Sequence, residues 1–303
     1  MIDRYHTPVL FNESVEALNL KPDSVVVDVT YGGGGHSKGI LKRLGKSGVL
    51  LAFDQDEDAL ANQMQDERLI FVNANFRFLI NFVKYYELDG EVDAIFADLG
   101  VSSHQFDTAE RGFSIRTDAK LDMRMNQDAS LNAHTVVNSY PENELLRIFR
   151  MYADLGNAAR KVVTTICRER NQRSIDTTSQ LVDLIENLVP HKKRNQFMAQ
   201  VFQAIRIEVN DEVGALMDFL EQSEKVLKKG GRLVVISYHS VEDRLVKNFM
   251  RSGNFEGEFE KDMYGVVEKP FDMISRKPIV PTDEEIENNP RARSAKLRIA
   301  VKL

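Results

Sequence analysis

The chain of 303 residues lacks the side chains from which disulfide frameworks and metal centres are built. Cys167 is its only cysteine, which excludes an intrachain disulfide and a zinc cluster made of several cysteines. The six histidines are far apart and never show the three- or four-residue spacing that places two metal ligands on one helix face. We therefore expect no metal and a reducing, cytoplasmic location.

Long apolar runs and an excess of positive charge are also missing. No stretch approaches the roughly 20 apolar residues that cross a bilayer, and the N-terminus lacks the basic start and apolar run of a secretory signal. We expect a soluble protein without a membrane partner. The net charge of −6 argues against a general polyanion binder. RNA binding would then depend on local basic clusters, which occur at residues 192–194 and 291–298.

Short apolar runs in the first hundred residues predict buried strands of a parallel sheet. The predicted strands cover residues 24–29, 49–53, 69–72 and 92–97. Amphipathic segments at 36–44 and 57–65 predict helices between them. This alternation is typical of a doubly wound α/β fold.

Helical patterns replace this alternation between about residues 130 and 229, with examples at 141–152 and 179–189. Strand patterns return at 232–237 and, as an edge or antiparallel strand, at 296–302. The simplest explanation is a helical unit inserted into the α/β core. We place the core at residues 1–104 and 203–303 and the insertion at 105–202.

A glycine-rich turn follows the first predicted strand and precedes a helix. Gly32–Gly35 would let the backbone approach a ligand closely, with helix N–H groups aimed at it. Asp54 ends the next strand, 19 residues after Gly35, at the spacing where a carboxylate binds ribose hydroxyls. A turn that binds no ligand is the alternative, but the two coupled features favour a nucleotide-like cofactor.

The details of this turn favour S-adenosylmethionine over a dinucleotide. The G-x-G-x-x-G pattern fails because Ser37 stands at the third glycine position. Asp28 lies four residues before the glycines, where a carboxylate would repel a pyrophosphate but favour ammonium and sulfonium charges. Asp98 ends the fourth strand at the carboxyl edge of the sheet, where open α/β folds bind ligands.

Eight ordered blocks then carry a family resemblance. They are HTPVL at 6–10, DVTYGGGGH at 28–36, DLGVSS at 98–103, RGFS at 111–114, LDMRM at 121–125, FQAIRI at 202–207, HSVEDR at 239–244 and NPRARSAKLR at 289–298. From end to end the chain resembles the ribosomal RNA small subunit methyltransferase H family, also called MraW. It departs from the family pattern at Ala119-Lys120, which replaces Gly-Pro, and at Tyr238 and Val241, which replace Phe and Leu.

The resemblance implies a Rossmann-like, seven-stranded class I methyltransferase core with an inserted all-helical subdomain. It also implies S-adenosylmethionine as cofactor and N4-methylcytidine in the decoding region of 16S rRNA as product. Carried over by motif, Gly34, Gly35 and His36 line the methionine part of the cofactor, Asp54 the ribose and Phe76 the adenine. Asp98 and Gln105 complete the cofactor set.

Two residues are candidates for the chemistry. Asp98 could accept a hydrogen bond from the cytosine amine, which would help to localise its delocalised lone pair, or it could bind the cofactor alone. His239 is the second candidate, for base contact or proton removal, and its alternative role is to cap the following helix. The predicted phosphate contacts are Arg291, Arg293, Lys296 and Arg298. Side chains that could stack on bases, or pack in the core instead, are Phe106, Phe113 and Tyr238.

Three functional classes follow from these patterns. A methyltransferase of 16S rRNA agrees with all of them, a nicotinamide-dependent oxidoreductase agrees with the fold alone, and a non-catalytic ribosome-assembly factor would retain the cofactor pocket. The sequence leaves open whether the substrate is free rRNA or the small ribosomal subunit. It also leaves open whether the enzyme is a homodimer, and whether the insertion grips RNA, grips protein or shields the site.

Overall fold

The computed structural model describes residues 8–100, 109–259, 267 and 269–303. The chain divides into two units, a core unit of Met1–Gly100 with Gly214–Leu303 and a helical unit of Val101–Val213. Within the described residues, every helix is too short or too polar to span a bilayer.

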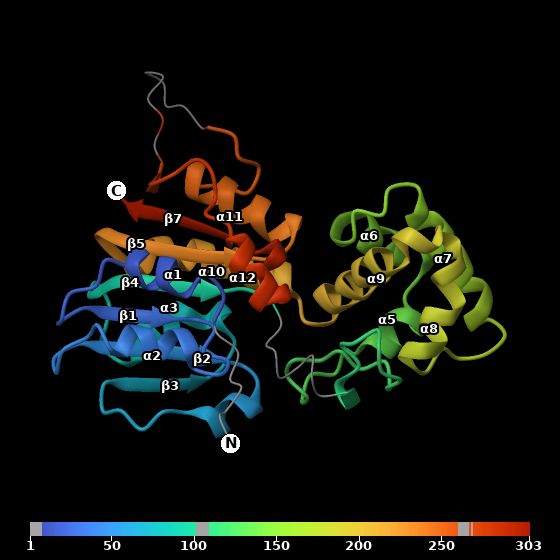
Figure 1. Cartoon of the computed structure of the whole chain (residues 1–303), viewed down its shortest axis with the longest axis horizontal. Helices are drawn as coiled ribbons and strands as arrows, with labels where there is room; N and C mark the ends of the chain where they lie inside the picture. Colours follow the sequence, from blue (N-terminus) through green and yellow to red (C-terminus); the bar gives the residue numbers. More distant parts are fainter. Residues whose placement is uncertain (1–7, 101–108, 260–266, 268) are drawn as a thin grey trace. The chain divides into compact units, whose positions relative to one another are not determined.

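The core unit contains a mixed sheet whose seven strands, counted over the described residues, run in the order β3-β2-β1-β4-β5-β7-β6 (Figure 1). The first five strands are parallel, and β7 runs antiparallel to both β5 and β6. Their bounds are β1 Val25–Asp28, β2 Val49–Asp54, β3 Leu69–Asn73, β4 Val92–Asp98, β5 Leu227–Ser237, β6 Phe271–Met273 and β7 Lys296–Lys302. This confirms the predicted seven-stranded, Rossmann-like α/β core.

Both faces of the sheet are covered, which explains the continuous apolar runs of its strands. Val26 and Phe96 belong to a cluster that includes Ile40 and Leu41 of α2, and Ala17 of α1 packs against it. On the other face, Phe53 makes an edge-to-face contact with Phe82 of α3. The helices of the core unit are α1 Phe11–Ala17, α2 Gly35–Leu41, α3 Leu79–Tyr85, α10 Glu212–Val226, α11 Ser240–Ser252 and α12 Asp283–Asn288, with 3₁₀ turns η1 Glu57–Asn62, η2 Phe76–Phe78 and η6 Pro290–Ser294.

The segment predicted as a helix at 57–65 is instead the short 3₁₀ turn η1. The hydroxyl of Tyr31 donates to the Asn62 carbonyl at 2.9 Å and accepts the Met64 N–H at 3.0 Å. Because these backbone groups bond to a side chain, they do not continue a helical ladder. The segment after β2 is thereby tied to the glycine turn.

The helical unit consists, after the 3₁₀ turn η3 Ala109–Arg111, of helices and 3₁₀ turns around their own apolar core. They are α5 Ala133–Ser139, α6 Glu142–Tyr152, α7 Ala158–Arg170, α8 Thr178–Ile185, η4 Glu186–Leu188, η5 His191–Lys193 and α9 Arg194–Val209. The predicted boundary after residue 202 falls inside α9, and the unit extends to Val213. The difference arises because Val201, Phe202 and Ile205 of this one helix are buried together in the helical core.

Candidate functional site

Three aspartates end three neighbouring strands of the sheet. Asp28 is the last residue of β1, Asp54 of β2 and Asp98 of β4, and β1 lies between β2 and β4. The chain leaves β1 toward β2 on one side and returns to β4 on the other, so this edge is a topological switch point. Open α/β sheets bind their ligands there, at the carboxyl ends of the strands.

The glycine turn connects β1 to α2 directly above this edge. Gly34 has φ +73°, and a Cβ added to it would lie 2.8 Å from the Tyr31 hydroxyl oxygen. The backbone N–H of Gly32 donates to Oδ2 of Asp54 at 2.7 Å, which joins the turn to the end of β2. At Gly35 an added Cβ would lie 2.4 Å from Pro8, so this glycine is also required for packing.

Asp28 is fully buried, and its hydrogen bonds hold the glycine turn in place. It accepts the Ser37 hydroxyl at 2.6 Å and the Thr30 N–H at 3.1 Å. The Thr30 hydroxyl oxygen in turn accepts the backbone N–H of Asp98 at 2.7 Å, which couples β1 to the end of β4. Burial raises the pKa of Asp28 to about 6, although its hydrogen bonds to Ser37 and Thr30 oppose the rise.

Asp54 is held by backbone donors. Its two oxygens accept the N–H groups of Gly32 and of Asp56, at 2.7 and 2.9 Å. Burial raises the pKa of Asp54 to about 6 against these hydrogen bonds. Since each carboxylate oxygen can accept more than one hydrogen bond, both retain capacity for ribose hydroxyls.

Asp98 has the most perturbed carboxyl of the three. Its Oδ1 accepts the Tyr238 hydroxyl at 2.8 Å, and its Oδ2 lies 3.7 Å from Nδ1 of His36. Burial raises the pKa of Asp98 to about 7; the Tyr238 hydrogen bond opposes this, and the Asp28 and Glu242 carboxyls add to it. The side chain is still 24% exposed, so a ligand can reach it.

His36 is buried beside these carboxyls and is neutral at physiological pH. Burial lowers the pKa of His36 to about 4, against a hydrogen bond to the Val9 carbonyl oxygen. The donating nitrogen of the neutral ring is Nε2, 3.1 Å from that oxygen, which leaves Nδ1 facing Asp98. Its ring centroid lies 4.5 Å from that of Phe96, so His36 also packs in the core.

Phe76 lies beyond the end of β3, next to the Asp54 side of the site. Asn75 caps its 3₁₀ turn and also donates from Nδ2 to Oε1 of Gln55, the residue after Asp54, at 2.8 Å. The ring of Phe76 is half-buried and makes an edge contact with Phe219 at 5.5 Å. The partly exposed ring is therefore suited to stacking on a purine whose ribose is bound by the neighbouring Asp54.

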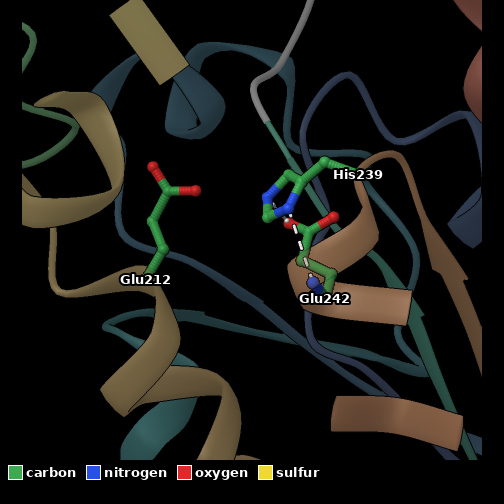
Figure 2. Close-up of side chains that lie close together, drawn as sticks. All are labelled: Glu212, His239 and Glu242. Atoms are coloured by element: carbon green, nitrogen blue, oxygen red, sulfur yellow. Dashed lines mark hydrogen bonds and ion pairs between the residues drawn. The ribbon is translucent and has the colours of Figure 1, made fainter. Parts of the chain in front are cut away.

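His239 caps α11, as one of its two expected roles requires. Its Nδ1 accepts the backbone N–H of Glu242 at 3.4 Å (Figure 2). In the neutral ring the proton therefore lies on Nε2, 3.0 Å from Oε1 of Glu242. This arrangement makes His239 a donor and leaves it poorly suited to remove a proton.

The four basic residues of the tail fall into two pairs. Arg298 is 5% exposed, and its Nε donates to Asp243 at 2.7 Å. Lys296 Nζ lies 3.1 Å from the same carboxylate. Buried against α11, Arg298 does not fit the predicted phosphate contact, because its charge is already neutralised. Arg291 and Arg293 are exposed on the turn η6.

The remaining residues predicted from the sequence are Gln105, Phe106, Phe113 and Tyr238. Gln105 and Phe106 lie outside the described residues. Phe113 is 5% exposed within the core of the helical unit, so it packs there and does not stack on a base. Tyr238 donates to Asp98, a role that the sequence did not indicate. Only its position could have indicated this role, because Tyr238 directly follows β5, the strand that pairs with β4.

The donor set of this site fits a cationic cofactor. Within the described part of the chain, the hydrogen-bond partners of the three aspartates are N–H and hydroxyl groups, and the neighbouring His36 is neutral. Buried carboxylates without a cation favour a ligand that brings positive charge. The ammonium and sulfonium groups of S-adenosylmethionine meet this need, whereas a pyrophosphate would be repelled.

Comparison with known proteins agrees with this chemistry. A model of the MraW methylase family matches residues 3–303 of the chain. A protein named ribosomal RNA small subunit methyltransferase H from Christiangramia forsetii is 56% identical over 299 residues, which cover 99% of this chain and 98% of the relative. Proteins of the same name from Flavobacterium johnsoniae and Parabacteroides distasonis are 56% and 53% identical with the same coverage.

Proposed function

This chain belongs to the MraW methylase family, and we propose that it methylates the N4 amine of a cytosine in the decoding region of 16S rRNA. Its methyl donor is S-adenosylmethionine. The name shared by its relatives, which are over half identical along nearly the whole chain, supports small-subunit rRNA as the substrate. A ribosomal substrate also supports a cytoplasmic location. The family excludes the nicotinamide-dependent alternative.

The observation that carries the proposal is the Asp98 carboxyl at the switch point of the sheet. When bound, S-adenosylmethionine supplies a methyl group that its sulfonium already activates, so the chain contributes mainly placement. A cytosine amine is a poor nucleophile because its lone pair is delocalised into the ring. A carboxylate that accepts a hydrogen bond from this amine helps to localise the pair.

Asp98 is suited both to accept this hydrogen bond and to take the proton that the amine must lose. Oδ1 is occupied by Tyr238, whereas the 3.7 Å between Oδ2 and His36 is too long for a hydrogen bond. Oδ2 therefore remains available to the amine. A carboxyl group with a pKa of about 7 can accept a proton at neutral pH and release it again.

We assign His239 to positioning and not to proton removal. With Nδ1 engaged by the Glu242 N–H, the ring fixes the first turn of α11 beside the carboxyl end of β5. It could donate a hydrogen bond from Nε2, but its geometry does not support a role as base.

We propose that RNA contacts come from exposed basic residues of both units. The amine lies on the pairing edge of cytosine, so the nucleotide must be splayed out of a single-stranded or loosened region. In the core unit, Arg291 and Arg293 can reach phosphates. In the helical unit, the exposed residues Arg160 and Lys161 line a shallow surface hollow of about 260 Å³ with Thr164, Thr165 and Leu188, and we include them among the candidate phosphate contacts.

Mass spectrometry of 16S rRNA tests reaction, atom and substrate together. Nucleosides from cells that lack the gene should lose N4-methylcytidine, and the purified protein with S-adenosylmethionine should restore it on free rRNA or on small subunits. An Asp98→Asn chain should fail to restore it. Unchanged nucleosides in the deletion strain would instead favour a non-catalytic assembly factor.

A further inference from the structure

The pairing of β4 with β5 places Tyr238 against the carboxyl group of Asp98. It directly follows β5, which is paired with β4, and its hydroxyl oxygen is 2.8 Å from Oδ1 of Asp98 at the end of β4. Its ring packs over Gly100, where an added Cβ would lie 3.3 Å from the ring, and its backbone N–H donates to Oε2 of Glu242 at 3.0 Å. Both ends of the residue are therefore fixed.

The hydroxyl is the donor in this contact. Burial raises the pKa of the Tyr238 phenol well above its usual value, and the nearby Asp98 and Glu242 carboxyls raise it further. The phenol therefore keeps its proton at neutral pH. A protonated phenol donates to a carboxylate and stabilises its charged form.

A carboxylate without this contact would have no fixed orientation. The χ2 rotation of aspartate is broad, with two nearly equivalent oxygens. The hydrogen bond from Tyr238 occupies Oδ1 and so leaves Oδ2 available to a ligand.

We propose that Tyr238 is a positioning residue for methyl transfer, holding the Asp98 carboxylate so that one oxygen stays directed at the cytosine amine. This rests on the proposed role of Asp98 as acceptor. Phenylalanine would keep the ring that packs over Gly100 and remove only the hydroxyl, so Tyr238→Phe should leave the fold intact.

The groups that face Asp98 determine how its acidity responds to that removal. They are Asp28 from β1, His36 from α2, Tyr238 after β5 and Glu242 from α11. The two acidic neighbours disfavour the carboxylate and His36 is neutral, whereas Tyr238 favours it. Replacing Tyr238 with phenylalanine should therefore raise the pKa of Asp98 and leave less of the carboxylate at neutral pH.

The test compares the wild-type chain, Tyr238→Phe and Tyr85→Phe, a matched change at a tyrosine that is 77% exposed. Single-turnover methyl transfer is followed from pH 5.5 to 9, with saturating S-adenosylmethionine and small subunits from cells lacking the gene. Carbon-13 NMR titration of the Asp98 carboxyl, assigned with Asp98→Asn, gives its pKa without any turnover.

For Tyr238→Phe we expect the midpoint of the rising limb and the titration of Asp98 to move up by about one pH unit, with a roughly tenfold slower transfer below the midpoint. The concentrations of S-adenosylmethionine and of small subunits that give half-maximal transfer, measured in separate titrations, should change less than twofold, and Tyr85→Phe should match the wild type. An unmoved titration and rate would overturn the proposal and leave Tyr238 a packing residue. A shifted titration without any effect on transfer would keep the contact but refute its positioning role. If wild-type transfer does not depend on Asp98 at all, the proposed function of Asp98 fails, a result that Asp98→Asn reveals separately.

Discussion

Replacing Asp98 with asparagine should make the protein more stable and less active. The amide oxygen of asparagine can still accept the Tyr238 hydroxyl, so the change removes the charge and keeps this hydrogen bond. What disappears is a carboxylate that is unfavourable in the folded chain, because burial and the Asp28 and Glu242 carboxyls raise its pKa. Active sites commonly contain groups whose removal stabilises the fold.

The size of the gain follows from the pKa of Asp98. A rise from 3.8 to about 7, at about 1.4 kcal/mol per pKa unit, corresponds to at most about 4 kcal/mol. The carboxyl is 24% exposed, so solvent screening and relaxation reduce this, and we expect about 1–2 kcal/mol. In a chain of 303 residues that raises the melting temperature by roughly 1.5–3 °C.

The sign of the pH dependence gives a second check. In the wild type the folded chain holds the Asp98 proton more tightly than the unfolded chain does. The stability that this tighter proton binding contributes is fully present below about pH 4 and is lost as the pH rises through about 7. The advantage of Asp98→Asn should therefore be small near pH 4, grow up to about pH 7 and stay constant above it.

The assay combines urea unfolding, followed by circular dichroism between pH 4.5 and 8.5, with single-turnover transfer and calorimetric titration of S-adenosylmethionine. Transfer should fall by about 100-fold or more, and cofactor affinity by less than tenfold. Asp272→Asn, at an exposed surface carboxylate, should change stability by less than about 0.5 kcal/mol at any pH. A less stable Asp98→Asn chain at pH 8, or equal losses in transfer and affinity, would refute the reasoning.

Three further predictions concern the turn, the tail and the protons of the site. Gly34→Ala should destabilise the turn by about 1–2 kcal/mol, because its φ is +73°, and calorimetry should show weaker cofactor binding. Neutralising Arg291 and Arg293 should weaken RNA binding and flatten its salt dependence. Arg298→Gln should leave Asp243 paired with Lys296 alone and destabilise the fold by about 1–3 kcal/mol in urea unfolding. Binding of the cationic cofactor near pH 6.5 should release protons from the buried aspartates, so the heat should depend on the ionisation enthalpy of the buffer. This release should cease by pH 8.5, and a buffer-independent heat at pH 6.5 would contradict the prediction.

The sequence was sufficient to place Asp28, Asp54 and Asp98 at one edge of the sheet. Each follows an apolar run buried on both faces, and parallel strands present their carboxyl ends at the same edge. This reasoning needs only local pattern and the doubly wound order. The same local pattern failed at 57–65, because Tyr31, 26 residues earlier, binds the backbone groups that a helix would need.

For the tail, residues 289–303, the sequence predicted the strand but not which of its basic side chains are exposed. Alternating apolar and basic residues at 296–302 predicted an edge or antiparallel strand, and this segment is β7, which runs antiparallel to β5 and β6. Which of its basic side chains are exposed depends on α11, whose Asp243 lies more than 50 residues away in sequence and accepts both Arg298 and Lys296. Arg298 was predicted to contact phosphate, but it forms an ion pair with the half-buried Asp243 of α11 instead.

Tyr238 and Asp98 illustrate why the chemistry of the site exceeds what its motifs specify. The two residues are 140 positions apart and are separated in sequence by the whole helical unit, so no spacing rule connects them. They meet because β5 returns to pair with β4 after the insertion, and the first residue beyond β5 then lies beside the last residue of β4. Any side chain at position 238 would face this carboxyl, and its chemistry would affect the acidity of Asp98. The proposed positioning role therefore predicts that the residue after β5 affects the pH range of methyl transfer.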